Sequence, residues 1–206
     1  LSLGLIGTNS YGTQENTWGY RFIEKSPLDA NKFTNTADLG IGYSHSFGNL
    51  NINAQILNGE GYKSEQSDNN MATYLRVMYG ESQLNKNDGY NVGFVMTSLE
   101  GDQGDINLVG LFGGWASNKL RLGLEYNQYE TDVTETLMSL YANYSISETL
   151  DVFVRNDMTE IVASVEDSDV TTSWIGVVCN PSKGLYISPN VAIQDDENNY
   201  RLTFMF

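Results

Sequence analysis

Four arginines of this chain have the chemistry and the spacing to bind charged groups. Each stands in a stretch where polar and apolar residues alternate: Arg76, Arg121, Arg155 and Arg201. Three carboxylates stand in stretches of the same kind: Glu125, Asp151 and Asp157. A guanidinium stays charged at physiological pH and donates paired hydrogen bonds to carboxylate or phosphate groups. Two interpretations stay open: the arginines pair with these carboxylates and fill space, or they contact a charged solute.

No other residue type predicts catalysis. His45 is the only histidine, and neighbouring residues of a strand point to opposite faces, so a Ser–His pair with Ser44 or Ser46 is not expected. Cys179 is the only cysteine, which excludes an intrachain disulfide and suits a small packing residue. Zinc-binding, P-loop and dinucleotide-binding motifs are absent from the sequence. We therefore predict no catalytic residue, no cofactor and no resident metal.

Strands must position these side chains, because alternation with a period of two recurs about twelve times along the chain. The predicted strands cover residues 1–7, 38–47, 50–58, 71–80, 89–98, 106–115, 119–129, 136–146, 150–159, 170–180, 185–194 and 199–206. Most have about 8–11 residues, the length that a tilted strand needs to cross a bilayer. No segment of useful length has the period of a helix, and no run of about 18 apolar residues predicts a membrane-spanning helix. We therefore predict an all-β chain that forms one domain, 1–206.

The connections between the predicted strands alternate in length. Short turns lie at 47–50, 80–88, 116–119, 147–149 and 181–184, and longer polar connections lie at 8–37, 59–70, 99–105, 130–135, 160–169 and 195–198. Short turns at one rim and long loops at the other are typical of a transmembrane antiparallel up-and-down β-barrel, whose short-turn rim faces the periplasm. The net charge of −15 comes from the longer connections and argues against nucleic-acid binding.

The last predicted strand shows the alternation most clearly. Its apolar face carries Tyr200, Leu202, Phe204 and Phe206, and its polar face includes Arg201. A soluble sheet also alternates, with its apolar face in a core, so the pattern alone does not decide. Aromatic residues near strand ends, the unequal rims and the terminal phenylalanine favour a sheet that faces lipid.

Two predicted strands are ambiguous, because both of their faces are apolar. In 106–115, Leu108 and Phe112 compete with Val109 and Leu111 for the outward face. In 170–180, Trp174 and Val178 compete with Ile175, Val177 and Cys179. Such strands would contact another subunit or a plug, or their register is assigned wrongly.

Short segments throughout the chain resemble a known family. They are the stretch 7–21, Asn58-Gly59-Glu60-Gly61-Tyr62, Arg155-Asn156-Asp157 and Ile187-Ser188-Pro189-Asn190-Val191. Together they are similar to porins of Gram-negative bacteria, with a distant likeness to the phosphate-selective porin group. The resemblance implies a water-filled channel in the bacterial outer membrane for passive diffusion of small hydrophilic solutes or ions. Those porins are usually longer, so this chain either closes a barrel of 12 strands or forms the C-terminal part of one with about 16–18.

The arginines and carboxylates named above would line such a channel, with Arg76 and Arg155 nearest the constriction. Because the charges of the predicted strands cancel, we expect mild charge selectivity at most. Loop 8–37 is too long for a simple connection, and folded inward it would narrow the channel. Its candidate constriction residues are Trp18, Tyr20, Arg21, Glu24 and Lys25. The alternatives for this loop are latching a neighbouring subunit and capping the mouth.

The expected partners are outer-membrane lipid and lipopolysaccharide, small hydrophilic solutes, and the barrel-assembly machinery. That machinery would bind the C-terminal strand through Tyr200, Leu202, Phe204 and Phe206, and assembly as a homotrimer stays open. Acidic clusters at 195–197 and at Glu166, Asp167 and Asp169 suit calcium ligation, but a solvated acidic rim is the favoured interpretation. Two functions compete with a channel: a structural or adhesive barrel with a plugged lumen, and a lipase-like outer-membrane enzyme.

Overall fold

The computed structural model describes residues 1–65, 69–100, 105–162, 168–195 and 197–206. Twelve strands form one antiparallel sheet, and each pairs with its neighbours in the sequence. They are β1 (Ser2–Gly7), β2 (Ala37–Phe47), β3 (Leu50–Leu57), β4 (Ala72–Gly80), β5 (Gly89–Leu99), β6 (Ile106–Ser117), β7 (Leu120–Glu130), β8 (Thr134–Ser147), β9 (Leu150–Val162), β10 (Ser168–Ser182), β11 (Leu185–Gln194) and β12 (Glu197–Met205). The all-β prediction is confirmed, and the predicted strand ends lie within about three residues of the observed ones.

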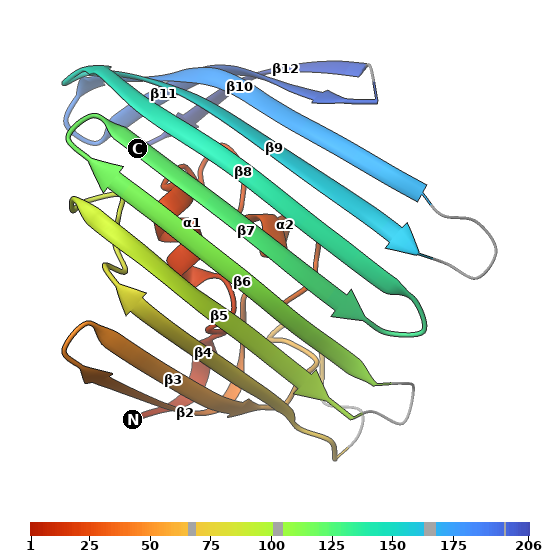
Figure 1. Ribbon diagram of the computed structural model, residues 1–206. Helices are drawn as coiled ribbons and strands as arrows, with labels where there is room; N and C mark the ends of the chain where they lie inside the picture. Colours follow the sequence, from red (N-terminus) through yellow and green to blue (C-terminus); the bar gives the residue numbers. More distant parts are fainter. Residues whose placement is uncertain (66–68, 101–104, 163–167, 196) are drawn as a thin grey trace.

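Short hairpin turns gather at one rim of the sheet, and the longer connections lie at the other (Figure 1). Three of the short turns contain a residue with positive φ: Gly48 at 60°, Asn118 at 55° and Gly184 at 87°. A left-handed residue in a tight turn matches the twist of the flanking strands, which is why glycine and asparagine occur there. The predicted alternation of connection lengths is confirmed in part: β11 and β12 are joined by only two residues on the long-loop side, and residues 81–88 join β4 and β5 on the short-turn side.

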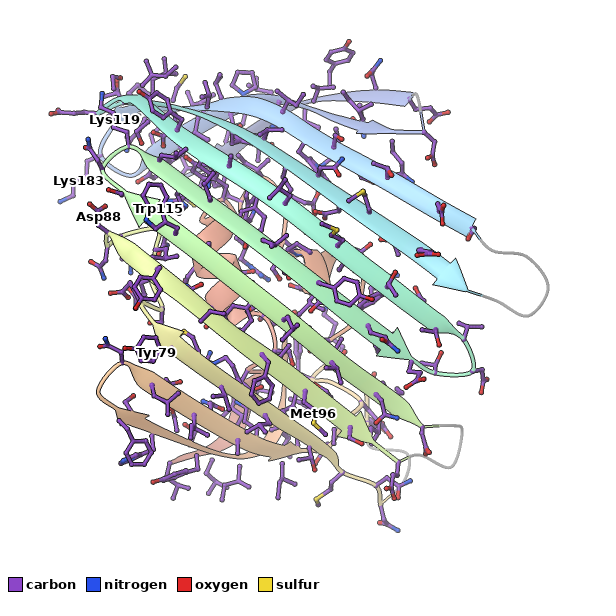
Figure 2. The ribbon with its side chains drawn as sticks, viewed as in Figure 1. Tyr79, Asp88, Met96, Trp115, Lys119 and Lys183 are labelled. Atoms are coloured by element: carbon purple, nitrogen blue, oxygen red, sulfur yellow. The ribbon has the colours of Figure 1, made fainter. Side chains whose placement is uncertain are left out.

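The convex face of the sheet is apolar and exposed. On β7, Leu124 is 47% exposed on the convex side, whereas its neighbour Glu125 is fully buried on the concave side. Tyr79 and Trp115 project from the convex face near the short-turn rim, and Met96 projects farther along (Figure 2). A broad apolar surface on the convex face of a curved sheet suits contact with lipid.

Two short helices lie in the connection between β1 and β2, and the sheet curls around them (Figure 1). They are α1 (Gly12–Trp18) and α2 (Pro27–Ala30). The sequence did not indicate them, because a helix of one or two turns is too short to show a period. No helix of the described residues is long and apolar enough to cross a membrane.

This helical connection explains the two ambiguous strands. On β6, Val109 is 54% exposed on the convex face, whereas Leu108 is fully buried on the concave face. On β10, Ile175 points outward and Trp174 points inward. Both inward sets pack in apolar clusters with residues of loop 8–37. Of the alternatives for these strands, contact with a segment inside the sheet is therefore correct, and that segment is the chain's own loop 8–37, which covers part of the concave face.

The sheet has two unpaired edges. Throughout the described residues, β1 pairs only with β2 and β12 pairs only with β11, so the twelve strands do not close into a barrel by themselves. This corrects one of the two alternatives for the strand count. Unpaired backbone groups in hydrocarbon cost several kcal/mol each, so both edges need further β-partners in a membrane.

Candidate functional site

Loop 8–37 folds inward onto the concave face of the sheet, where α1 packs against β6, β7 and β8. Helix α1 buries Gln14 and Trp18 and is capped at its C-terminal end by Gly19, whose φ is 78°. The positive φ favours glycine, and a Cβ atom at Gly19 would lie 2.5 Å from Nη2 of Arg121, so a larger residue would also push that side chain aside. Of the three alternatives for this loop, the structure shows the inward one.

Trp18 is the centre of an aromatic cluster that attaches the loop to the sheet. Its side chain is fully buried, and the ring centroids of Tyr20, Tyr141 and Phe153 each lie 5.6 Å from its own. Burying one large apolar side chain contributes about 1.5–3 kcal/mol, and a well-oriented aromatic pair adds about 0.5–1.5 kcal/mol. Trp18 therefore lies between the loop and the sheet, where it anchors the loop, and it does not face an open lumen.

A second apolar cluster attaches the part of the loop around α2. Tyr11, Leu28 and Phe33 are buried together with inward residues of β4, β5, β6 and β8. The ring of Phe33 stacks on that of Tyr129, with the centroids 4.8 Å apart. Two independent clusters thus fix the loop on the sheet, which sets the position of the charged residues at its tip.

Arg155 lies beneath Trp18 and is fully buried. Its Nε donates to Oδ1 of Asp157 at 2.8 Å, its Nη2 donates to the other oxygen of that carboxylate, and its Nη1 donates to the carbonyl of Lys25. Its guanidinium carbon lies 5.3 Å from the ring centroid of Trp18 and 4.8 Å from that of Trp174. A buried charge of this kind is stable only when it is paired. Arg155 therefore ties the loop to β9 and does not line the open lumen, which corrects the prediction for this residue.

Glu125 is the second lumen prediction that burial corrects. The residue is fully buried; its Oε2 accepts a hydrogen bond from Asn127 at 3.3 Å, and its Oε1 has no hydrogen-bond partner among the described residues. Asp157 is almost as deeply buried and also accepts a bond from the hydroxyl of Ser139 at 2.6 Å. These carboxylates and Arg155 form a buried polar cluster between the loop and the sheet. Their charges therefore stabilise the position of the loop.

The other residues predicted to line the channel, called wall residues here, remain partly exposed to solvent. Arg201 pairs with Glu24 at 3.1 Å, and Nη2 of Arg76 donates to Oδ1 of Asn51 at 2.8 Å. Both arginines are half-buried. Their contact with a solute stays a prediction.

Arg121 and Asp151 meet the loop from the short-turn side. Nη2 of Arg121 donates to the carbonyl of Trp18 at 3.1 Å, and the guanidinium lies 5.4 Å from the ring centroid of Tyr20. The hydroxyl of Tyr20 donates to Oδ2 of Asp151 at 2.8 Å. Both wall residues therefore support the loop while remaining partly exposed.

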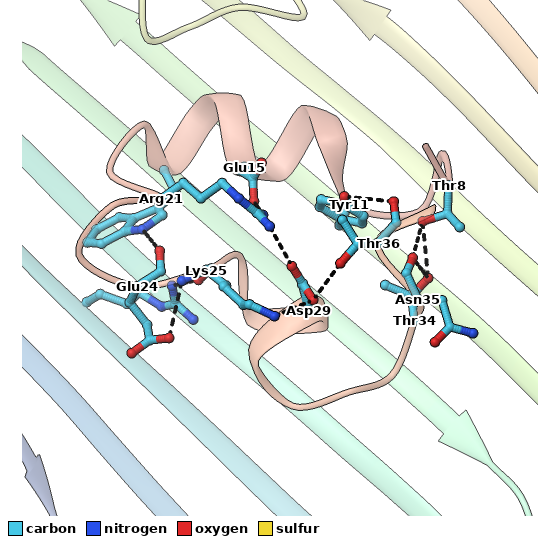
Figure 3. A network of polar contacts seen from close by, with 12 residues as sticks. Thr8, Tyr11, Glu15, Arg21, Glu24, Lys25, Asp29, Thr34, Asn35 and Thr36 are labelled. Carbon is cyan, nitrogen blue, oxygen red and sulfur yellow. Dashed lines mark hydrogen bonds and ion pairs between the residues drawn. The ribbon is translucent and has the colours of Figure 1, made fainter. Parts of the chain in front are cut away.

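The segment between α1 and α2, called the loop tip here, carries Arg21 and Lys25, and these bind carboxylates of the two helices (Figure 3). Arg21 pairs with Glu15 and with Asp29, and Nζ of Lys25 lies 3.1 Å from Oδ1 of Asp29. Asp29 is buried, whereas the side chains of Arg21 and Lys25 are 41% and 50% exposed. The tip is thus fixed by a buried carboxylate and presents two cations to water.

Two buried tyrosines of the loop stay protonated over the physiological range. Burial, with a smaller contribution from Glu15, raises the pKa of Tyr11 to about 12, and its hydroxyl donates to the carbonyl of Thr36 at 3.1 Å. Burial and then the hydrogen bond to Asp151 raise the pKa of Tyr20 well above its usual range. Both hydroxyls therefore act as permanent hydrogen-bond donors that hold the loop.

Open space remains on both sides of the loop. A cavity of about 780 Å³ lies between loop 8–37 and the long-loop ends of β8 to β12. The charged residues that line it are Glu24, Glu135, Asp157, Asp195, Glu197 and Arg201. Two smaller cavities, of about 400 and 210 Å³, lie toward the short-turn rim, and Lys119 and Asp151 line both. The loop narrows the concave side without filling it.

His45 lies outside this site. Its ring stands on the convex side of β2 between those of Tyr43 and Phe47, and the ring centroid of Phe47 is 4.4 Å away. Ser44 and Ser46 occupy the alternate positions and are bonded by an asparagine of β3. The imidazole and the neighbouring hydroxyls therefore point to opposite faces of the strand, as the sequence predicts.

The described part of the chain contains no group of three or more His, Cys, Asp or Glu side chains that could hold a metal ion. Glu166, Asp167 and Asp196 of the acidic clusters lie outside the described residues. Cys179 is a free, half-buried thiol.

The fold of the chain is that of outer-membrane β-barrel porins. A loop L8 deletion mutant of OmpT, an outer-membrane protein of Vibrio cholerae, matches with a TM-score of 0.75 and 13% identity over 98% of this chain and 74% of its own. OmpF of Salmonella typhi, in a complex with daunomycin, matches with a TM-score of 0.71 and 13% identity over 98% and 72%. A refined porin structure matches with a TM-score of 0.60 and 14% identity over 82% and 60%. No family model and no curated protein matches the sequence.

At identities this low, the TM-scores show the architecture of the chain and nothing beyond it. The architecture agrees with the apolar convex face, and both support the bacterial outer membrane, the location that the sequence predicts. What passes through the barrel is a separate question, which depends on the loop and the cavities beside it.

Proposed function

We propose that this chain forms most of a channel through which small hydrophilic solutes or ions diffuse passively across the outer membrane. The observation that carries the proposal is the inward loop 8–37, which narrows the concave side and leaves a cavity of about 780 Å³ beside it. A polar concave face and an apolar convex face are what a water-filled barrel in lipid requires. The porin fold supports the same function.

The loop tip is the proposed constriction. Glu24 lines the large cavity, and the partly exposed Arg21 and Lys25 stand beside it. Trp18 and Tyr20 support the tip from below and contact no passing solute. The wall residues with partly exposed side chains are Arg76, Arg121, Arg201 and Asp151.

We also propose that about four further strands complete the barrel. The edges of β1 and β12 are unpaired, and an up-and-down antiparallel barrel needs an even number of strands. The match with this chain covers 74% and 72% of the length of two porin-fold chains. If strands are spread evenly along those chains, twelve strands over that share correspond to about 16 in the whole barrel, a size typical of porins. The chain spans 60% of the third matching structure.

The proposed partners follow from the two outer surfaces. The convex face would contact lipid and lipopolysaccharide, and β12 would be bound by the barrel-assembly machinery through its outward face. On that face, Leu202 is 59% and Phe204 is 49% exposed. Homotrimer assembly fits the same fold, and chemical crosslinking in native membranes would distinguish a trimer from a monomer.

We propose that the protein catalyses no reaction. A lipase-like enzyme would need a histidine that activates a nearby hydroxyl, whereas the ring of His45 lies between two aromatic rings on the outward face. A lipase assay on the purified protein should give only background turnover, and His45→Ala should leave it unchanged. Turnover that His45→Ala abolishes would refute this part of the proposal.

Single-channel recording of the purified full-length protein in planar bilayers tests the channel. Discrete steps of conductance are expected, and protein unfolded before addition serves as the control. A folded protein that inserts and gives no steps would favour the alternative function, a structural or adhesive barrel with a plugged lumen.

A further inference from the structure

The large cavity beside the loop carries an excess of negative charge. Five carboxylates line it. They are Glu24 of the loop, Glu135 of β8, Asp157 of β9, Asp195 of the turn between β11 and β12, and Glu197 of β12. Arg201 is the only arginine or lysine among its lining residues. The cavity lies at the ends of the strands that carry the long connections, so it forms the outer mouth of the concave side.

The arginines nearest the cavity are already engaged. Arg201 pairs with Glu24 at 3.1 Å, and Arg155 is buried against Asp157. Glu135, Asp195 and Glu197 have no ion-pair partner within the described residues. Two of the five carboxylates are therefore compensated, and three are left to act on whatever occupies the cavity.

The cavity is also lined by several neutral polar groups that can exchange hydrogen bonds with an occupant. Trp174 lines it as well and is only 6% exposed, so it contributes a largely buried aromatic wall. The neutral polar residues in the lining are Asn31, Thr159, Thr172, Gln194 and Asn199.

From this combination we propose that the cavity admits small organic cations that also carry hydroxyl groups, with amino sugars as the representative class. The inference rests on the proposed channel function and names its preferred solute. The ammonium group is attracted by the three uncompensated carboxylates, and the hydroxyl groups exchange hydrogen bonds with the amides and threonine hydroxyls of the lining. A phosphate-like anion would meet the same carboxylates as a repulsive barrier, so the likeness to phosphate-selective porins does not extend to the solute.

Three solutes of equal size and different charge test the proposal directly. Proteoliposomes that contain the full-length protein are loaded with glucosamine, glucose or glucuronate at mildly acidic pH and low ionic strength, and efflux is followed. Glucosamine should leave about fivefold faster than glucuronate, with glucose between them, because a cleft with charge of one sign concentrates the opposite sign. The ratio should approach one at high salt, where such fields are screened.

Matched triple variants separate the cavity from the general acidity of the rim. E135Q/D195N/E197Q removes the three uncompensated charges of the lining and should abolish the preference for glucosamine. E100Q/E130Q/D132N makes the same change in net charge at exposed residues outside the lining, and it should retain most of the preference.

Each outcome decides a different statement. Equal efflux of the three solutes from the unmodified protein, or equal effects of the two triple variants, would overturn the cation preference while leaving the channel intact. Absence of efflux even for glucose would overturn the channel itself. Faster efflux of glucuronate would reverse the assignment.

Discussion

Two arginine–carboxylate pairs lie on the concave side of the sheet, and they have the same chemistry in different surroundings. Arg155 and Asp157 have side chains that are 0% and 3% exposed, and they fix the loop. Arg201 and Glu24 have side chains that are 35% and 21% exposed, and they border the large cavity. Water screens the second pair, whereas the first has no solvent to replace a lost partner. Burial, more than residue type, therefore decides whether a lumen arginine acts on the fold or on a solute.

Replacing Arg155 by alanine should give the largest effect. It would leave Asp157 buried without its partner and remove the bond to the carbonyl of Lys25, and breaking a buried pair in this way costs about 3–5 kcal/mol. The unfolding temperature in detergent should fall, and conductance steps should become larger and noisier as the loop leaves its place.

Arg201→Ala is the matched control for that variant. The pair that it removes is half-exposed, so the free energy of unfolding should fall by less than about 1 kcal/mol. Equal losses in the two variants would contradict the distinction between the buried and the exposed pair.

Gly19→Ala should come next in size, because it acts on the backbone that presents the loop tip. An alanine in the left-handed conformation costs about 1–2 kcal/mol. Its Cβ atom would also lie 2.5 Å from Nη2 of Arg121, so the arginine side chain would have to move. Gly12→Ala serves as the control, since a Cβ there meets nothing within 4 Å and alanine favours a helix. Thermal unfolding in detergent measures both, and a Gly12→Ala loss as large as that of Gly19→Ala would remove the argument.

The sequence predicts the wall of this molecule better than its interior. Alternation fixes which face of a strand a residue occupies, so the strands, the apolar belt and the outward Tyr200, Leu202, Phe204 and Phe206 follow from it. It does not show what covers the inward face. Arg155 and Glu125 point inward as expected, but a segment distant in the sequence lies over them.

A signal for that cover was nevertheless present in the sequence. β6 and β10 are apolar on both faces, and their inward residues, including Trp174, pack under loop 8–37. Tyr141 also belongs to the aromatic anchor, yet its strand alternates normally, so nothing marked it. Long-range packing on a polar-looking face depends on which loop folds inward, and this is not encoded in the period of the strand.

Alkaline pH should weaken the loop attachment in a defined range. Burial raises the pKa of Tyr11 from 10.0 to about 12. Below pH 10 the hydroxyl is protonated in both the folded and the unfolded chain, so its contribution to stability is complete; between pH 10 and about 12 only the unfolded chain loses the proton, and stability falls. Denaturant titrations across this range should show the fall; Tyr11→Phe should reduce its slope, and Tyr20 should contribute to the slope that remains.

The smallest effects should come from the exposed pair, and they should have opposite signs. Arg201→Gln leaves Glu24 uncompensated beside the cavity, so the ratio of cation to anion permeability should rise by about twofold or less, as expected for a screened pair. Glu24→Gln leaves Arg201 uncompensated and should lower the same ratio. In the double variant the two changes should cancel, because it removes one positive and one negative charge from the same place and leaves the net charge there unchanged. Reversal potentials in a salt gradient measure all three, and shifts of the same sign in both single variants would show that the pair supports the loop and does not set the field of the cavity.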